Sequence, residues 1–396
     1  MKIHFTGRYL LIPILFCILS QDYMLGQNTG FTLKEIQNRL QSRLDSLIHE
    51  QGVPGATFSL LFHDGSNLTL ASGFADVEER ISMKPNAFMF SGSVGKTFVA
   101  AVILKLCEKG VIHLKKKASE YLKSESWFMK VPNAKDITVE MLLNHTAGVP
   151  EYVYHETIWQ QIKLNPDKVW GVEERLFFIF DDPPANPPGQ GWAYADSHYI
   201  LLGLITEKVT GKSCFSVLDE LILKPCNLYQ TRAANQRSLP GLVAGYTSLS
   251  DELLLPRKVM TDGKYAFNPQ LEWTGGGLVT TVSDLTAWAK QLYNGAVLSP
   301  SMKALMLTPV PFPTGLAENS SYGLGCIIGK TDGTAWYGHT GFVPGYITIM
   351  QYIPSYDLSL AMQINTDALH GEAAQQLFND LKRITCSIFP DQSKKH

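Results

Sequence analysis

The chain has 396 residues, of which 45% are hydrophobic and 18% charged, and its net charge is −2 at pH 7. This length allows one large or two medium domains with a substantial core. The near-neutral charge gives no electrostatic reason to expect nucleic-acid binding, and nothing in the sequence is periodic or low in complexity, which excludes a repeat architecture.

The N-terminus has the pattern of a secretory signal peptide, expected over residues 1–26. Lys2 and Arg8 precede the apolar run Tyr9–Leu19, and Ser20 or Gly26 offers a small residue for cleavage after it. The run is too short to cross a bilayer comfortably, so no stable membrane insertion is expected after cleavage. A periplasmic or secreted protein is therefore predicted, with an uncleaved anchor as the alternative.

A helix and a hairpin are expected next. Thr32 and Glu35 form a capping-box pattern, which predicts the start of an amphipathic helix that ends near Gly52. Two strand patterns follow, Ala56–Phe62 and Leu68–Ser72, separated by a turn that contains Asp-Gly. The helix is expected to lie on this hairpin.

The apolar run Phe98–Cys107 predicts a buried helix, and Ser93 and Lys96 stand at its start. A spacing of three residues in a helix places the amine beside the hydroxyl. A serine hydroxyl becomes a nucleophile when a neighbouring base takes its proton, and burial favours the neutral form of lysine, which can act as that base. This pair is the candidate catalytic centre.

Two better-defined motifs match part of the same stretch, but each lacks a glycine that it requires. A phosphate-binding loop needs glycine at Phe90, and a nucleophile elbow needs glycine at Ser91. A nucleophile elbow also belongs to a chain of alternating strands and helices, which this sequence does not show.

From about residue 115 to 274 the pattern changes to helical segments and proline-rich loops, which predicts an inserted helical lobe. This part includes the helix His198–Thr210, ended by Gly211. A helix near Ser283–Tyr293, with Ser283 as its N-cap, opens the last part of the chain. The strands and helix expected after it are Tyr322–Ile328, Ala335–His339, Tyr346–Ile353, Leu358–Ile364 and Ala368–Ile384.

These elements predict an α+β fold over residues 31–388. Successive strands with tight turns form an antiparallel sheet, and helices from both ends of the chain can cover its faces. The α/β lobe is expected to consist of about 31–114 and 275–388, and the helical lobe of about 115–274.

Several further stretches accompany the Ser93 motif in a specific order and spacing. They are Leu142–Gly148, Pro188–Asp196 with Tyr194 inside it, Gly275–Val279, and His339-Thr340-Gly341. Together they resemble the serine β-lactamase and penicillin-binding protein superfamily, specifically its class C β-lactamase, DD-carboxypeptidase and esterase branch. The resemblance covers roughly Leu33 to Ile384. It implies a five-stranded antiparallel sheet flanked by helices, a helical lobe, and an active site between the two.

The resemblance also implies roles for individual residues. Ser93 would be acylated by substrate, and Lys96 and Tyr194 would form the proton-transfer network, with the pKa of Tyr194 lowered by a positive Lys96. The oxyanion would lie between the backbone N–H groups of Ser93 and Phe342. The residues expected to bind substrate are His339, Thr340, Gly341, Phe342 and Asp196.

The sequence departs from the family pattern at two positions. Asp196 stands where the family commonly has asparagine, and an ionised carboxylate cannot donate a hydrogen bond to a substrate carbonyl. Either Asp196 faces another group or the acyl substrate differs from a penicillin-like amide. His339 stands where β-lactamases usually have lysine, and a histidine there would be only partly charged near neutral pH. His145 is expected to be structural, because nothing gives it a proton to move.

The sequence therefore predicts an exported serine hydrolase that forms an acyl-enzyme at Ser93 and cleaves an ester or amide. A peptide or peptidoglycan-like substrate of the DD-carboxypeptidase or esterase type is favoured. The alternatives are a class C-like β-lactamase and a penicillin- or peptidoglycan-binding protein that stays acylated. No Cys-x-x-Cys or His-Glu-x-x-His motif occurs, so neither a metal nor another cofactor is expected.

Overall fold

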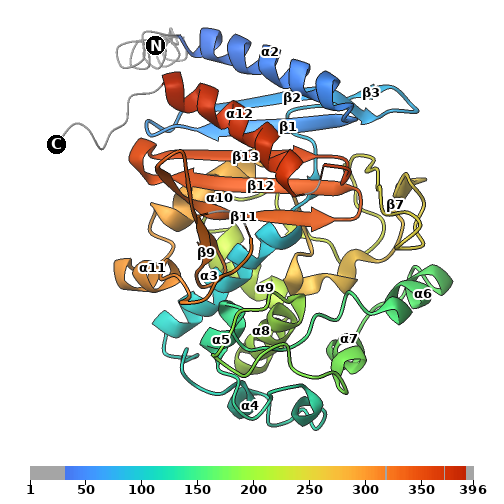
Figure 1. Cartoon of the computed structure of the whole chain (residues 1–396), viewed down its shortest axis with the longest axis vertical. Coiled ribbons are helices and arrows are strands. Elements are labelled where there is room, and N and C mark those ends of the chain that lie inside the picture. The colour runs from blue at the N-terminus through green and yellow to red at the C-terminus, as the bar shows by residue number, and fades with distance from the viewer. Residues whose placement is uncertain (1–31, 317–318, 370, 389–396) are drawn as a thin grey trace, which may run out of the picture.

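The structure, a computed structural model, describes residues 32–316, 319–369 and 371–388. The expected signal peptide, residues 1–26, lies outside these ranges. A large antiparallel sheet separates two long helices on one face from a group of helices on the other (Figure 1). None of the helices in the described ranges is long and apolar enough to cross a membrane.

Among the described residues the large sheet has eight strands, in the order β3-β2-β1-β13-β12-β11-β10-β9. Five of them, from β2 to β11 in this order, have seven to ten residues each and correspond to the expected five-stranded sheet. The short strands β3, β10 and β9 extend it to eight. The bounds are β1 Gly55–Leu61, β2 Asn67–Asp76, β3 Ile81–Ser82, β9 Ser320–Tyr322, β10 Ile327–Thr331, β11 Thr334–Val343, β12 Tyr346–Ile353 and β13 Leu358–Ile364.

The single strand expected at Tyr322–Ile328 is wrong, because the chain leaves the sheet between β9 and β10. Gly325 adopts a φ of 81° there, and its N–H donates to the carbonyl of Leu143 at 3.1 Å. A Cβ at Gly325 would lie 2.7 Å from the hydroxyl of Tyr199, so only glycine allows this close approach. The loop between β9 and β10 therefore connects the edge of the sheet to the helices that pack against it.

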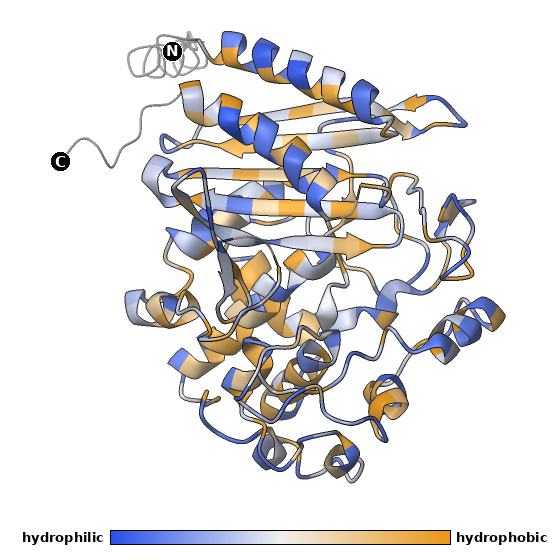
Figure 2. Ribbon diagram, viewed as in Figure 1, coloured by the Kyte–Doolittle hydropathy of each residue, from blue (hydrophilic) through white to orange (hydrophobic). Residues whose placement is uncertain are grey.

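Helices α2 (Leu33–Gln51) and α12 (Glu372–Ile388) cover one face of the sheet with their apolar sides inward (Figure 2). The capping box at Thr32 is confirmed, and α2 ends at Gly52 in the left-handed conformation. α12 begins four residues later than expected, directly after Gly371, whose φ of 77° is not helical.

Helix α10 (Val282–Tyr293) packs on the opposite face of the sheet, against β1, β12 and β13. Its N-cap is Thr281, whose side chain accepts the N–H of Asp284, and not Ser283 as expected. The hydroxyl of Ser283 instead meets that of Thr69 on β2 at 3.1 Å.

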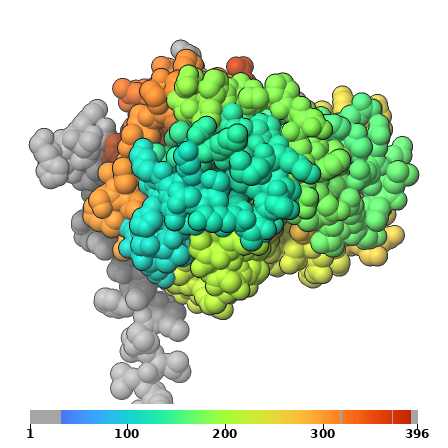
Figure 3. All heavy atoms as spheres, turned by 90° about the horizontal axis from the view of Figure 1, so that it is seen from below, coloured from blue at the N-terminus to red at the C-terminus, as the bar shows by residue number. Residues whose placement is uncertain are grey.

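Helix α3 (Gly95–Glu108) lies between the sheet and α8 (Asp196–Thr210), and both helices are mostly buried. α8 ends at Gly211 as expected. The helices that surround them form the face seen in Figure 3. The bounds of the remaining helices are α4 Ala118–Tyr121, α5 Val139–Leu143, α6 Glu156–Leu164, α7 Val172–Leu176, α9 Cys214–Leu218 and α11 Pro300–Met306.

Short strands connect this helical part to the rest of the chain. β8 pairs with both β4 and β5, and β6 pairs with β7. Their bounds are β4 Met89–Phe90, β5 Arg232–Ala233, β6 Met260–Thr261, β7 Lys264–Tyr265 and β8 Leu278–Thr280. The pairing of β4 with β8 brings the chain just before Ser93 next to the chain just after Gly277.

Candidate active site

Ser93 and Lys96 meet where the chain enters α3. Ser93 lies in the 3-10 turn η1 (Gly92–Val94), one turn before Lys96, whose side chain is completely buried. The Nζ of Lys96 donates hydrogen bonds to Oγ of Ser93 at 2.9 Å and to the carbonyl of Gly275 at 2.5 Å. A third contact joins it to the carboxylate of Asp196. The predicted pairing of amine and hydroxyl is therefore present.

Three glycines let the backbones around Ser93 approach one another closely. A Cβ at Gly92, where φ is 51°, would lie 2.5 Å from the amide nitrogen of Phe342. A Cβ at Gly276 would lie 2.6 Å from the carbonyl carbon of Gly92, and one at Gly341 would lie 2.0 Å from the carbonyl oxygen of Ser91. Real side chains cannot occupy such positions, so the glycine motifs explain how these segments come into contact.

This packing brings together the two backbone groups that the resemblance assigns to an oxyanion hole. The Ser93 amide nitrogen is 3.1 Å from the position that a Cβ on Gly341 would take, and the next residue on β11 is Phe342. The N–H groups of Ser93 and Phe342 thus belong to segments in van der Waals contact.

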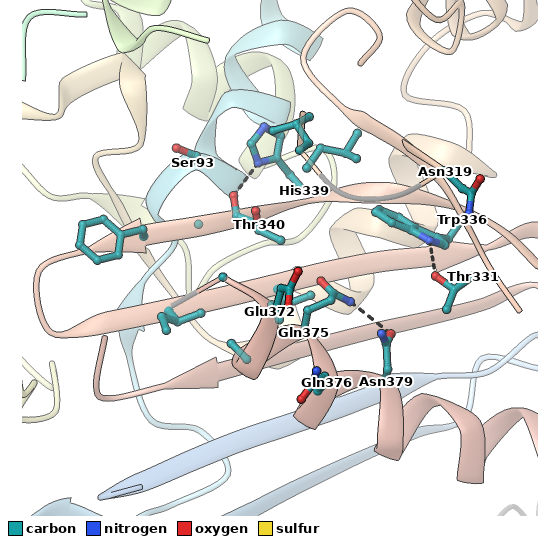
Figure 4. Close-up of a pocket in the computed structure, with 18 of the residues that line it drawn as sticks. Ser93, Asn319, Thr331, Trp336, His339, Thr340, Glu372, Gln375, Gln376 and Asn379 are labelled. Carbon is teal, nitrogen blue, oxygen red and sulfur yellow. Dashed lines mark hydrogen bonds between the residues drawn. The ribbon is translucent and has the colours of Figure 1, made fainter. Parts of the chain in front are cut away.

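A groove of about 660 Å³ opens beside Ser93 and runs over β11 toward α12 (Figure 4). Tyr194 and the expected substrate-binding residues of β11 line its catalytic end, where the side chains of Thr340 and Phe342 are exposed. Four carboxamides and two carboxylates line its other end. The carboxamides are Asn319, Gln375, Gln376 and Asn379, and the carboxylates are Asp332 and Glu372.

The hydroxyl of Tyr194 is buried, and no described residue forms a hydrogen bond of ordinary geometry with it, although Lys96 and Ser93 lie near enough to influence its pKa. Its ring lies over Lys96, with Nζ 4.9 Å from the ring centroid. Burial raises the pKa of Tyr194 more than the charge of Lys96 lowers it, so the net shift is upward and the phenol is neutral at pH 7. The expectation of a lowered pKa is not supported.

Asp196 faces Lys96 and does not line the groove, which corrects its expected role in substrate binding. Burial is the largest single influence and lowers the pKa of Lys96, but the charge and hydrogen bond of Asp196, together with a contribution from Tyr194, outweigh burial and raise the pKa above its ordinary value. The backbone N–H of Asp196 donates to Glu151 at 2.5 Å. Of the two sequence-based alternatives, the structure selects the one in which Asp196 faces another group, and that group is the ammonium of Lys96.

Two further carboxyl groups surround the pair of Asp196 and Lys96, and the sequence did not identify them. Burial, followed by the charge of Asp196, raises the pKa of Glu151 well above its ordinary value and that of Glu272 to about 8. Glu272 is therefore mainly protonated at pH 7, and the raised pKa of Glu151 favours its neutral form in the same way. Only their positions in the sequence could have indicated these two residues. Glu151 comes just after the Leu142–Gly148 motif, and Glu272 comes just before the glycine run.

His145 holds the segment that carries Tyr194. Its carbonyl accepts the N–H of Ala193 at 3.0 Å, and its Nδ1 accepts the N–H of Ala195 at 3.3 Å. Its ring centroid lies 4.2 Å from that of Tyr194. His145 is structural, as expected, but its contacts secure both neighbours of a candidate catalytic residue.

His198 sets the tautomer of His145. The Nε2 of His198 accepts the N–H of Val149 at 3.3 Å, so its proton lies on Nδ1, which donates to Nδ1 of His145 at 2.8 Å. Burial is the main reason that the pKa of His198 falls to about 3 and that of His145 falls well below its ordinary value. Both rings are therefore neutral at pH 7.

His339 is buried on β11, and its two ring nitrogens are occupied. Nδ1 donates to the carbonyl of Thr340 at 2.5 Å, and Nε2 accepts the hydroxyl of Tyr322 at 2.9 Å. Burial, assisted by the charge of Lys96, lowers the pKa of His339 to about 3. The imidazole is neutral near pH 7, in contrast to the partial charge expected from the sequence.

No group of three or more His, Cys, Asp or Glu side chains in the described ranges could hold a metal ion. The site consists of a hydroxyl, an amine, a phenol and a carboxylate beside an open groove. Such a set can carry out nucleophilic attack with proton transfer.

Comparisons with known proteins agree with this geometry. A profile of the family described as Beta-lactamase matches residues 37–383. Penicillin-binding protein 4* of Bacillus subtilis (strain 168) is 28% identical over 290 residues, 70% of this chain and 60% of that protein, so this chain spans less than two thirds of its length. Penicillin-binding protein 4 of Amycolatopsis lactamdurans is 26% identical over 366 residues, 87% of each chain.

Solved structures show the same fold. A D-stereospecific amidohydrolase from Streptomyces sp. has a TM-score of 0.75 at 24% identity, covering 87% of this chain and 97% of that one. A D-amino acid amidase from Ochrobactrum anthropi SV3 has a TM-score of 0.76 at 21% identity, covering 89% and 98%. Since the family profile spans most of the chain, this protein belongs to the Beta-lactamase family and is a serine hydrolase of the β-lactamase and penicillin-binding protein superfamily.

Proposed function

We propose that this chain is an exported hydrolase that forms an acyl-enzyme at Ser93 and cleaves amide or ester bonds in small peptides or peptide-like molecules. The observation that carries the proposal is the hydrogen bond of 2.9 Å between Nζ of Lys96 and Oγ of Ser93, at the end of an open groove. The penicillin-binding relatives and the amidases with this fold support an acyl-transfer reaction.

In acylation, Oγ of Ser93 bonds to the substrate carbonyl carbon while its proton passes to Lys96. Lys96 is an ammonium in the resting structure, so it first loses a proton, either to Asp196, the acceptor in contact with it, or to solvent. The N–H groups of Ser93 and Phe342 stabilise the oxyanion. The proton then passes through Lys96 or Tyr194 to the leaving amine or alcohol as its bond to carbon breaks.

Deacylation reverses these roles. A water molecule gives its proton to the same network and bonds to the acyl carbon, and the ester bond to Ser93 breaks. The products are a carboxylic acid and the free serine. A protein that carries out the first step without the second is the penicillin-binding alternative.

The groove favours an extended polar substrate over a small apolar ester. Its far wall carries four carboxamides from two separate segments, which can donate and accept hydrogen bonds along a peptide. His339 is neutral, so it does not supply the positive charge with which a lysine at that position would hold a β-lactam carboxylate. Both observations favour the peptidase or amidase reaction over a β-lactamase.

The test is the intact mass of the protein after exposure to a fluorophosphonate and, separately, to a penicillin, with Ser93→Ala as control. We expect both reagents to label wild type and neither to label the variant. Turnover of D-amino acid amides, D-alanyl-D-alanine peptides and a cephalosporin then separates the activities. Rapid cephalosporin hydrolysis would select the β-lactamase, and a stable penicillin adduct without turnover of any substrate would select the binding protein. Unchanged labelling of Ser93→Ala would refute the proposed nucleophile.

A further inference from the structure

A second cavity, of about 300 Å³, lies beyond the far end of the groove. Thr331, Asp332 and Trp336 line both spaces, so the two share a wall. The indole N–H of Trp336 donates to Oγ1 of Thr331 at 3.0 Å and fixes that wall, as Figure 4 shows. The second cavity is bordered on its other side by the last turns of α12, which contribute Lys382, Arg383, Cys386 and Ser387.

Lys382 is the one charged residue among the buried residues of α12, with 6% of its surface exposed. Its Nζ donates to Oε1 of Gln351 on β12 at 3.2 Å and lies 6.0 Å from the ring centroid of Trp336. In the described part of the chain no carboxylate lies within ion-pair distance of this ammonium. A buried cation without a counter-ion is costly, which makes this position a candidate for an anionic ligand.

The amide of Gln351, which contacts Lys382 but lines neither cavity, gives a second sign that an acceptor is missing beside this lysine. Gln351 is 1% exposed, and its Nε2 has no hydrogen-bond partner among the described residues. Of the three ammonium protons of Lys382, one has a side-chain acceptor, Oε1 of Gln351, and the two amide protons of Gln351 have none among the described residues. Buried donors of this kind are normally satisfied, so the surplus indicates that something binds beside them.

The other titratable groups at the cavity do not neutralise Lys382. Apart from burial, Cys386 and then Asp332 raise the pKa of Lys382 and Arg383 lowers it, and the carboxylate of Asp332 itself pairs with Arg383 at 3.5 Å. Burial raises the pKa of Cys386 to about 11, so this thiol carries no charge at pH 7. Burial lowers the pKa of Lys382 to about 8, which leaves most of it protonated at pH 7. The charged groups that line the cavity therefore sum to one positive charge.

We propose that this cavity is a carboxylate-binding subsite, in which Lys382 receives the terminal carboxylate of a chain that lies along the groove from Ser93. Gly341, beside Ser93, and Trp336, at the shared wall, are five residues apart on β11, or about 17 Å at 3.3 Å per residue. An extended peptide of about five residues spans the same length. The link to the substrate rests on the proposed function, whereas the carboxylate site itself does not.

The first experiment measures binding without catalysis. Glutarate and its uncharged diamide, glutaramide, are titrated by calorimetry into the Ser93→Ala protein at pH 7, alone and combined with Lys382→Met. We expect glutarate to bind at least tenfold more tightly than glutaramide, and the Lys382→Met variant to lose that preference. Lys303→Met is the matched control, because among the described residues that lysine donates to the carbonyl of Gly295, at 2.9 Å, and lines neither cavity.

Glutarate binding should also weaken as the pH rises through about 8, because the ammonium of Lys382 loses its proton there. Lys382→Gln, which keeps a polar side chain without the charge, replaces Lys382→Met should the latter fail to fold. Absence of glutarate binding, equal binding of glutaramide, or unchanged binding by the Lys382 variants would each overturn the carboxylate site.

A second experiment asks whether the carboxylate belongs to the substrate. Peptide substrates whose chain ends in a carboxylate, five residues from the scissile bond, are compared with the same peptides ending in a carboxamide. We expect a KM at least fivefold lower for the carboxylate, with the difference absent in Lys382→Met. An equal KM for both would overturn the link to the substrate. If neither set of peptides is hydrolysed, the result would count against the proposed function. The calorimetry with glutarate would still test the carboxylate-binding subsite.

Discussion

Asp196→Asn is the change that most directly tests how this site sets the charge of Lys96. The substitution keeps the shape of the side chain and one acceptor but removes the charge that meets a completely buried ammonium. An opposite charge at this range raises the pKa of an amine by about 1 to 3 units, and burial acts in the other direction. Without that charge, we expect the pKa of Lys96 to fall by about this amount.

The consequence can be measured without knowing the substrate. The rate of Ser93 labelling by a fluorophosphonate is followed from pH 5 to 10 in wild type and in Asp196→Asn. If neutral Lys96 is the base, the rising limb of the pH–rate profile in Asp196→Asn lies about 1 to 3 pH units lower than in wild type. At a given pH on that limb, the variant then contains about 10 to 1,000 times more neutral amine. A limb at the same pH in both proteins would refute the assigned role of Lys96 as base.

Stability gives a second measurement of the same pair. The folded-state pKa of Lys96 is raised above its unfolded value, so the stabilisation is present below pH 10.5 and is lost as the pH rises through the folded-state pKa. Removing one partner of a buried ion pair costs about 3 to 5 kcal/mol, and asparagine should lose less because it still accepts a hydrogen bond. Asp284→Asn, at another largely buried aspartate, is the matched control and should leave the labelling profile unchanged.

Other expectations follow from the same contacts. Tyr194→Phe should slow labelling by about 100-fold or more without changing the melting temperature, if its phenol relays the proton, and an unchanged rate would remove it from the network. His145→Ala should lower kcat more than it raises KM, because both neighbours of Tyr194 lose an anchor; a change in KM alone would contradict this. Gly341→Ala should abolish labelling while the circular dichroism spectrum stays native, since its Cβ would lie 2.0 Å from a backbone oxygen. For His198 and His339, the unfolded state binds more protons between pH 3 and 6.5, so stability falls as the pH drops through this range, by up to about 1.4 kcal/mol per pH unit for each ring. Between pH 4.5 and 6.5, the free energy of unfolding measured with urea should change less steeply with pH in His339→Gln than in wild type.

Local signals in the sequence identified much of the fold. The capping box at Thr32, the hairpin that follows it, and the end of α8 at Gly211 all depend on neighbours within a few residues. The strand Tyr322–Ile328 was misread because its interruption depends on Gly325, whose contacts are with α3 and α8. Contacts with residues more than 100 positions away leave no periodic trace in the sequence.

The candidate nucleophile could be found in the same way, because Ser93 and Lys96 are one helical turn apart. Their spacing predicted the hydrogen bond that the structure contains. The residues that set their charge could not be found, since Asp196 and Glu272 come from other segments and act through burial and proximity. Tyr194 was identified only through the order of motifs, and its raised pKa depends on the surrounding protein.

The sequence by itself thus determined the family, the nucleophile, its neighbouring amine and the elements that carry them, because each depends on residue type and short-range spacing. Tertiary structure alone decided that Asp196 faces Lys96, that His339 is neutral, and that Lys382 lies buried beside a cavity. Charge state and accessibility are properties of a residue's surroundings, and those surroundings exist only once distant segments have packed together.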